Sequence, residues 1–142
     1  LSGCIATGQN ILAALATGAD LAYIGSPFIA TSEANVIDEY KEMIVESSAQ
    51  DIINSDAFSG ASANFLIGSI KRAGLDPQNL KRNPEKSLDA SENGQALNTW
   101  KDIWGCGQGI AAVKEVVSTA ELIDRMTREF VAAKADFVKR IS

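Results

Sequence analysis

The chain has 142 residues, a formal net charge of −5 at pH 7 and no histidine. Its Lys and Arg residues are scattered among carboxylates, which argues against a nucleic-acid partner because that binding depends on clustered cations. The longest apolar stretch, residues 11–30, is interrupted by Gly, Asp and Pro, so no membrane span is predicted.

The first thirty residues predict a helix between two turns that contain glycine. Thr7 is a suitable N-cap, and Gly18 is a suitable residue to end the helix. Its predicted apolar stripe consists of Ile11, Leu12, Leu15 and Ala16. Residues 21–24 follow as a short apolar run without polar alternation, which predicts a parallel strand that is buried on both faces.

The two turns, at residues 3–4 and 25–26, fit a phosphate site. In a (β/α)8 barrel, the loops after strands seven and eight commonly bind phosphate through backbone N–H groups. The missing Cβ permits close backbone approach at Gly3, and at Gly25 it lets the chain leave a strand with any φ. An ordinary αβ unit with two glycine turns explains the same spacing.

The rest of the chain is predicted to be mostly helical. A weak strand is expected at residues 51–54, and the polar stretch 79–95 is expected to be an exposed loop. Trp100 and Trp104 share one helix face and are interpreted as core residues. The last helix is amphipathic and is expected to pack on the exterior of a barrel. Helices are predicted after Ser32 and at residues 61–73, 93–104 and 119–141.

The chain lacks histidine, and its cysteines and carboxylates are not spaced as metal sites or acid–base catalysis require. With no histidine, no Cys-x-x-Cys and no calcium-loop spacing, we expect no metal. None of the carboxylates shows a pairing that indicates a raised pKa, so no catalytic acid or base is named. The only two cysteines, Cys4 and Cys106, are far apart and imply no disulfide framework, which favours a reducing, cytoplasmic location.

Several short sequence motifs in the chain carry a family resemblance. Those in the first thirty residues are Gly3-Cys4-Ile5, Gly18-Ala19-Asp20 and Gly25-Ser26-Pro27-Phe28. Those further on are Phe58-Ser59-Gly60, Ala63-Asn64-Phe65-Leu66, Ser69-Ile70, Ala73-Gly74-Leu75-Asp76-Pro77, Trp100-Lys101-Asp102-Ile103-Trp104 and Gly107-Gln108-Gly109. In this order they resemble the nitronate monooxygenase (2-nitropropane dioxygenase-like) family of FMN-dependent TIM barrels.

The resemblance implies an α/β fold, namely the C-terminal fragment of a (β/α)8 barrel with a mostly helical extension. The match begins at the end of strand seven and includes strand eight. Residues 1–48 are then the last βα units, residues 49–118 a helical excursion, and residues 119–142 a C-terminal amphipathic helix. A missing N-terminal barrel portion, which in this family contains an active-site histidine, would be required for activity.

The resemblance also implies FMN as cofactor, with Gly3, Cys4, Gly25 and Ser26 at its phosphate. Cys4 stands where the family has a second glycine, and we expect its contact to persist only if its φ is negative. Ser26 replaces the usual Thr. Gln108, after Gly107, is the candidate for the substrate or flavin edge, with an ordinary polar turn as the alternative.

The function that the resemblance implies is oxidation of alkyl nitronates with O₂ by an FMN-dependent oxidoreductase that acts on a small-molecule substrate. An FMN-dependent enoyl-acyl-carrier-protein reductase is an alternative, because it shares the glycine turns. A noncatalytic helical interaction fragment with a vestigial anion site is a third possibility, and it would bind no flavin. The fragment by itself is expected to be inactive.

Overall fold

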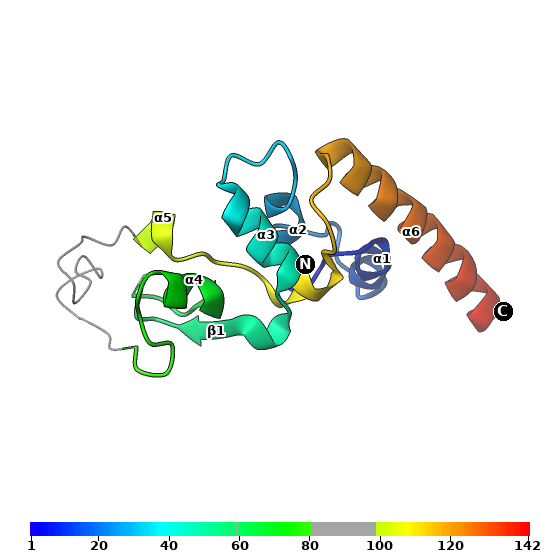
Figure 1. The fold of residues 1–142 in the computed structure, drawn as a ribbon. Helices are drawn as coiled ribbons and strands as arrows, with labels where there is room; N and C mark the ends of the chain where they lie inside the picture. The colour runs from blue at the N-terminus through cyan, green and yellow to red at the C-terminus, as the bar shows by residue number, and fades with distance from the viewer. Residues whose placement is uncertain (59, 81–98) are drawn as a thin grey trace. The chain divides into compact units, whose positions relative to one another are not determined.

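A computed structural model describes residues 1–58, 60–80 and 99–142, and the side chains of Thr99 and Trp100 are outside this description. The chain divides into two compact units (Figure 1). The first consists of Leu1–Glu46 and Gly107–Ser142, and the second is Ser47–Cys106. None of the described helices is both long and apolar enough to cross a membrane.

The first unit is helical, and its first helix, α1, is capped as the sequence predicts. Thr7 caps α1 through a reciprocal pair of hydrogen bonds with Asn10. At the other end, Gly18 has φ +91°, and its N–H donates to Leu15 O at 3.0 Å, which confirms it as the terminating residue. The helices of this unit are α1 (Gly8–Ala16), α2 (Ser26–Ile29), α3 (Asp38–Glu46), the 3-10 helix η2 (Gln108–Ala112) and α6 (Thr119–Ile141).

Helix α1 contacts α6 at a point where there is no room for a side chain. A Cβ on Gly8 would overlap the Met126 carbonyl oxygen and the Phe130 nitrogen, and it would lie 2.6 Å from Glu129 Cβ. The Gly8 N–H donates to the Glu129 carboxylate at 2.8 Å. Gly8 therefore allows the two helix backbones to approach closely.

The predicted apolar stripe of α1 needs correction. The buried positions are Gly8 and Ala14, whereas Leu15 is 40% exposed. Ile11 and Leu12 are half-buried, and Ala16 is exposed. Small residues are buried because the contact with α6 is close, so the larger side chains lie at its margin or outside it.

The predicted strand at residues 21–24 is not formed. Tyr23 makes an isolated parallel bridge with Ser2, and its N–H donates to Leu1 O at 2.8 Å. Leu21 and Tyr23 are 79% and 75% exposed, so this segment is not buried on both faces. A single bridge does not make a stable strand. The segment is nevertheless extended beside residues 1–3 in parallel, as two neighbouring barrel strands would be.

The second unit contains a two-stranded antiparallel sheet, β1 (Ile52–Ser55) and β2 (Ala63–Leu66), in which Ile52 pairs with Leu66. The weak strand prediction at residues 51–54 therefore coincides with β1 to within one residue. The predicted helix at residues 61–73 is wrong in its first half, because residues 63–66 pair with β1. The helices of this unit are the 3-10 helix η1 (Ala49–Asp51), α4 (Ile67–Arg72) and α5 (Thr99–Asp102).

The core of the second unit is aromatic. The Phe58 and Phe65 rings meet edge to face with centroids 4.9 Å apart, and they pack with Ile70 and Ile103. Trp104 is 2% exposed, which confirms it as a core residue. The guanidinium of Arg72 lies 4.1 Å from the centre of its ring.

Three helix boundaries complete the comparison with the prediction. The helix expected after Ser32 begins only at Asp38, and in the described part of residues 93–104 the helix is limited to α5. Helix α6 is confirmed from Thr119 to Ile141, with Ser118 and Glu121 forming its capping box. The predicted exposed loop at residues 79–95 lies outside the described residues from position 81 onward.

Candidate functional site

The two glycine turns, which are separated by about twenty residues in the sequence, line one pocket of about 200 Å³. The parallel bridge between Ser2 and Tyr23 holds the two segments side by side just before the turns. A third segment, after the second unit, supplies the rest of the wall. The lining residues are Ser2, Gly3, Cys4, Ile5, Tyr23, Gly25, Ser26, Pro27, Gly107 and Gly109.

The two glycines that were predicted to approach a phosphate both face open space. A Cβ built on Gly3 or on Gly25 would have no protein atom within 4 Å. Gly3 has φ +97°, a conformation that favours glycine. Gly25 has φ −118°, so the expectation that it needs unusual backbone freedom is wrong. What Gly25 provides is space in front of its backbone.

Two backbone donors of the second turn have no acceptor within the described part of the protein. Among the described residues, no acceptor contacts the N–H of Gly25 or of Ser26. Pro27 follows at the start of α2, where its missing N–H costs nothing. The second turn can therefore bind an anion with backbone donors and without a cationic side chain.

The Ser26 hydroxyl joins the second turn to residues 107–109, which we name the 107–109 turn. Its Oγ accepts a hydrogen bond from the Gly107 N–H at 2.6 Å. A Cβ on Gly107 would lie 3.3 Å from this oxygen, which is a tight contact. Residues 81 positions apart carry no spacing signal, so sequence reasoning did not find this bond.

The first turn departs from expectation at Cys4. Its φ is +55°, whereas a negative φ was the condition for a phosphate contact at this residue. L-residues other than glycine rarely adopt this conformation, which costs energy that other contacts must offset. The Cys4 carbonyl lies 3.1 Å from where a Cβ on Gly109 would be, so the 107–109 turn is packed closely on it.

Gln108 lies between these two contacts. Its Oε1 accepts a hydrogen bond from the Cys4 thiol, with 3.6 Å between sulfur and oxygen, and the side chain is exposed. Gly107 and Gly109 line the pocket, whereas Gln108 is not among the lining residues. Gly107 and Gly109, the two glycines of the Gly-Gln-Gly motif, therefore allow the 107–109 turn to pack against both predicted phosphate turns.

The pocket is lined by backbone, small polar and apolar groups, together with the Cys4 thiol and the Tyr23 phenol. The lining residues include no charged side chain. In the second unit, burial raises the pKa of the Cys106 thiol to about 12, which keeps this thiol protonated at neutral pH. Within the described ranges, no group of three His, Cys, Asp or Glu side chains is placed to hold a metal ion.

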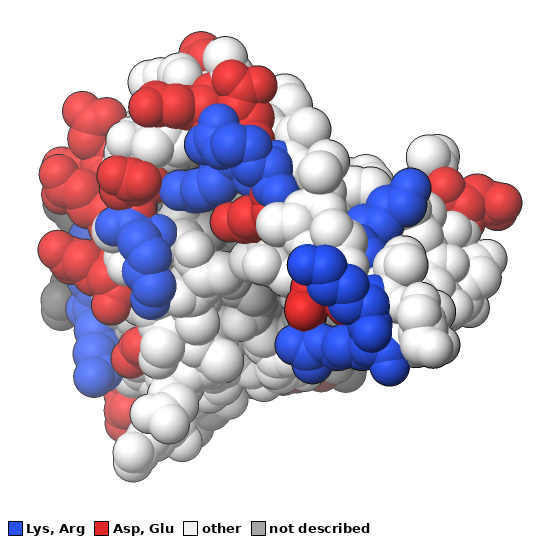
Figure 2. Space-filling view, turned by 90° about the vertical axis from the view of Figure 1, so that its right-hand side faces the viewer, with Lys and Arg blue, Asp and Glu red and all other residues white. Residues whose placement is uncertain are grey.

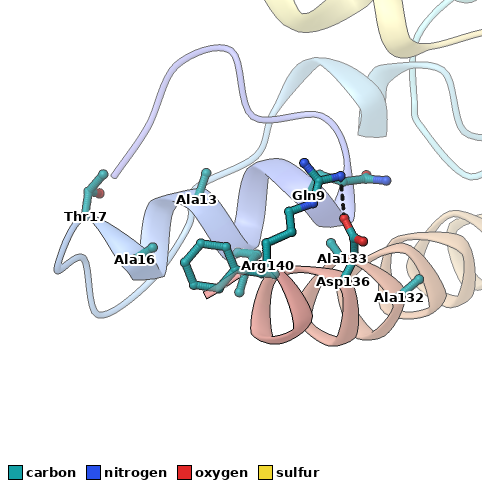
Figure 3. A pocket seen from close by; sticks show the side chains of 10 residues that line it. Gln9, Ala13, Ala16, Thr17, Ala132, Ala133, Asp136 and Arg140 are labelled. Atoms are coloured by element: carbon teal, nitrogen blue, oxygen red, sulfur yellow. Dashed lines mark ion pairs between the residues drawn. The ribbon is translucent and has the colours of Figure 1, made fainter. Parts of the chain in front are cut away.

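A second, larger pocket of about 750 Å³ lies between α1 and the C-terminal half of α6 (Figure 3). Its walls are mainly alanine, leucine and phenylalanine side chains. Two of its few charged groups already neutralise each other, because Arg140 pairs with Asp136 at 2.7 Å. On the face shown in Figure 2, basic side chains lie next to acidic ones. This groove offers an apolar surface but no reactive group.

Solved structures share the fold of this chain. FabK from Thermotoga maritima is 23% identical, with a TM-score of 0.69, over 98% of this chain and 46% of that chain. A nitroalkane oxidase from Streptomyces ansochromogenes is 24% identical, with a TM-score of 0.68, over 96% of this chain and 40% of that chain. Both are built on a TIM barrel. The chain thus has the fold of part of a barrel protein.

Sequence comparison gives the family. The family model for nitronate monooxygenase matches residues 2–129, so the chain belongs to the nitronate monooxygenase family. A nitronate monooxygenase from Paraburkholderia phytofirmans is 31% identical over 138 residues, which is 90% of this chain and 36% of that protein. The chain therefore spans little more than a third of this relative. Members of the family are oxidoreductases and are generally flavin-dependent.

Proposed function

We propose that the pocket between the two glycine turns holds the phosphate group of FMN. Both turns were predicted from the sequence, and both line the same pocket. A Cβ at Gly3 or Gly25 would face open space there, and this arrangement is the observation that carries the proposal. Membership of a generally flavin-dependent family supports the choice of a flavin nucleotide over other phosphates.

The proposed binding of the phosphate group depends on backbone N–H groups. The N–H groups of Gly25 and Ser26 would donate to phosphate oxygens, and Gly3 would allow the ligand to approach the first turn. Because the φ of Cys4 is positive, we assign that residue to the wall of the site and not to a phosphate contact. With no charged side chain in the lining, affinity would come from oriented dipoles and the Ser26 hydroxyl.

We further propose that the complete protein oxidises alkyl nitronates with O₂. FMN, when bound, would supply the electron-transfer chemistry. The residues described above would bind and orient the cofactor, and the lining of the pocket contains no histidine and no carboxylate. We therefore place the catalytic base in a barrel portion outside this chain, where the small-molecule substrate would also bind.

The proposed function assigns a different role to each of three parts of the chain. Residues 1–48 would form the last βα units that hold the phosphate, and residues 119–142 the C-terminal helix. Residues 49–118 would form an excursion that contains the β1–β2 sheet and is therefore not the purely helical one that was predicted. The two free cysteines are compatible with a cytoplasmic protein. The fragment alone would bind the cofactor without turning over a substrate.

The test is turnover by the chain joined to a complete barrel. Oxygen consumption with a nitronate should depend on added FMN, and it should fall with Gly25→Val, which places a branched side chain in the open space. The same samples assayed with an enoyl thioester and NAD(P)H provide the control for the reductase alternative. Turnover of the enoyl thioester without any turnover of the nitronate would overturn the proposed reaction. Nitronate oxidation that does not depend on added FMN would overturn the proposal of FMN as cofactor.

A further inference from the structure

Ser26 is placed so that one hydroxyl can contact two partners. Its Oγ accepts from the Gly107 N–H at 2.6 Å, and the residue also lines the pocket. A serine hydroxyl has one donor hydrogen and two acceptor lone pairs. The bond from Gly107 uses one acceptor position, which leaves the donor hydrogen for an oxygen atom of a ligand in the pocket.

The 107–109 turn has little freedom to move by itself. A Cβ on Gly107 would come within 3.3 Å of Ser26 Oγ, and one on Gly109 within 3.1 Å of the Cys4 carbonyl. Gln108, between them, is bonded to the Cys4 thiol. The 107–109 turn is thus in close contact with Ser26 on one side and with Cys4 on the other. A change in the hydrogen bonding of Ser26 would therefore alter how this turn is held.

We propose that Ser26 is a positioning residue that couples occupancy of the pocket by a phosphate group to the placement of the 107–109 turn. The inference rests on the proposed function for the nature of the ligand. A phosphate oxygen that accepts the Ser26 Oγ–H polarises the hydroxyl and makes it a better acceptor for the Gly107 N–H, since linked hydrogen bonds strengthen one another. The turn, with Gln108, is held more firmly when the ligand is bound.

The experiment measures amide hydrogen exchange by NMR on the chain joined to a complete barrel. Without ligand, Ser26→Ala should accelerate exchange at Gly107 by about three- to tenfold, the equivalent of one hydrogen bond, whereas Ser26→Thr, which keeps the hydroxyl, should not. Ser2→Ala is the matched control, because Ser2 lines the same pocket without bonding to Gly107. Ser26→Cys preserves volume with a poor acceptor and replaces Ser26→Ala if that variant does not fold.

Added FMN then tests the coupling itself. In the native chain and in Ser26→Thr, FMN should slow exchange at Gly107 by a further factor of about two or more, and this response should be lost in Ser26→Ala. If FMN shifts the Gly25 amide resonance but leaves exchange at Gly107 unchanged, the coupling is overturned and the phosphate site stands. If FMN affects neither amide, the phosphate site fails and the coupling fails with it.

Discussion

Gly8 and Gly25 belong to the same compact unit, yet a side chain would meet opposite surroundings at the two positions. A Cβ on Gly8 would overlap the backbone of α6, whereas a Cβ on Gly25 would meet no protein atom within 4 Å. Both have backbone conformations that other residues can adopt. The first position is thus closed by the protein and the second is left open, so we expect Gly8 to matter for stability and Gly25 for the phosphate contact that we propose.

The largest expected effect is on stability at Gly8. Gly8→Ala should lower the free energy of unfolding by about 3 kcal/mol, because the backbones of α1 and α6 must separate to admit the methyl group. Denaturant unfolding followed by circular dichroism measures this. Gln9→Ala, at the exposed next position, serves as the control and should change stability by less than about 0.5 kcal/mol. Equal stability of Gly8→Ala and the native chain would contradict the close contact.

Gly25→Val should show the opposite pattern. We expect FMN affinity to fall by about tenfold to a hundredfold, because the branched side chain separates two backbone donors from a charged acceptor, while thermal stability stays nearly unchanged. Isothermal titration together with a thermal melt of the same sample measures both. Gly25→Ala, with a smaller group, should lose less affinity, and a larger stability loss than affinity loss would show that Gly25 serves packing.

Gln108→Ala should have a smaller effect, and on turnover only. In the protein with a complete barrel, FMN content should stay near normal while turnover falls about twofold to tenfold, the worth of one neutral hydrogen bond in the transition state. Steady-state kinetics on a nitronate, with flavin occupancy from visible absorbance, provides the measurement. Unchanged turnover would assign Gln108 to an ordinary turn, and loss of flavin would assign it to cofactor binding.

The smallest expected effect is a pH dependence in the first unit, away from the pocket. The Thr119 N–H donates to both Glu33 carboxylate oxygens at 3.0 and 2.9 Å, and this bonding lowers the pKa of Glu33 below its usual 4.5. A carboxyl with a lowered folded-state pKa stabilises the fold above its unfolded pKa and loses that contribution as pH falls through the folded value. Protection of the Thr119 amide, measured as its exchange rate relative to the intrinsic rate at the same pH, should therefore fall below about pH 4.5, and Glu33→Gln should remove this pH dependence of the protection.

The sequence could predict what depends on local residue chemistry. The N-cap at Thr7, the glycine stop at Gly18 and the last helix follow from patterns within a few residues, and all are confirmed. The strand predicted at residues 21–24 failed because a parallel strand depends on neighbours that are distant in the chain, and Tyr23 has only a single bridge, to Ser2. β2 was missed for the same reason, since it pairs with β1.

The candidate site shows the same limit. The glycine turns could be found because their residue types are unusual, and the Gly-Gln-Gly motif marked the third segment of the pocket. The bond from Gly107 to Ser26 could not be found because its partners lie 81 residues apart. The positive φ of Cys4 could not be found because a residue other than glycine gives no local signal for it. Gly8 was likewise not singled out, since nothing near it in sequence indicates the approach of α6.

The central claim is that the open glycine pocket binds a phosphate group, and a comparison of FMN with riboflavin tests it most directly. The two molecules carry the same ring system, and riboflavin lacks the phosphate. Titration of each into the chain joined to a complete barrel should show FMN binding at least about tenfold more tightly, since each charged hydrogen bond contributes about 1.5 to 3 kcal/mol. Gly25→Val should abolish the difference. Equal affinities of the native chain for the two flavins would contradict the account.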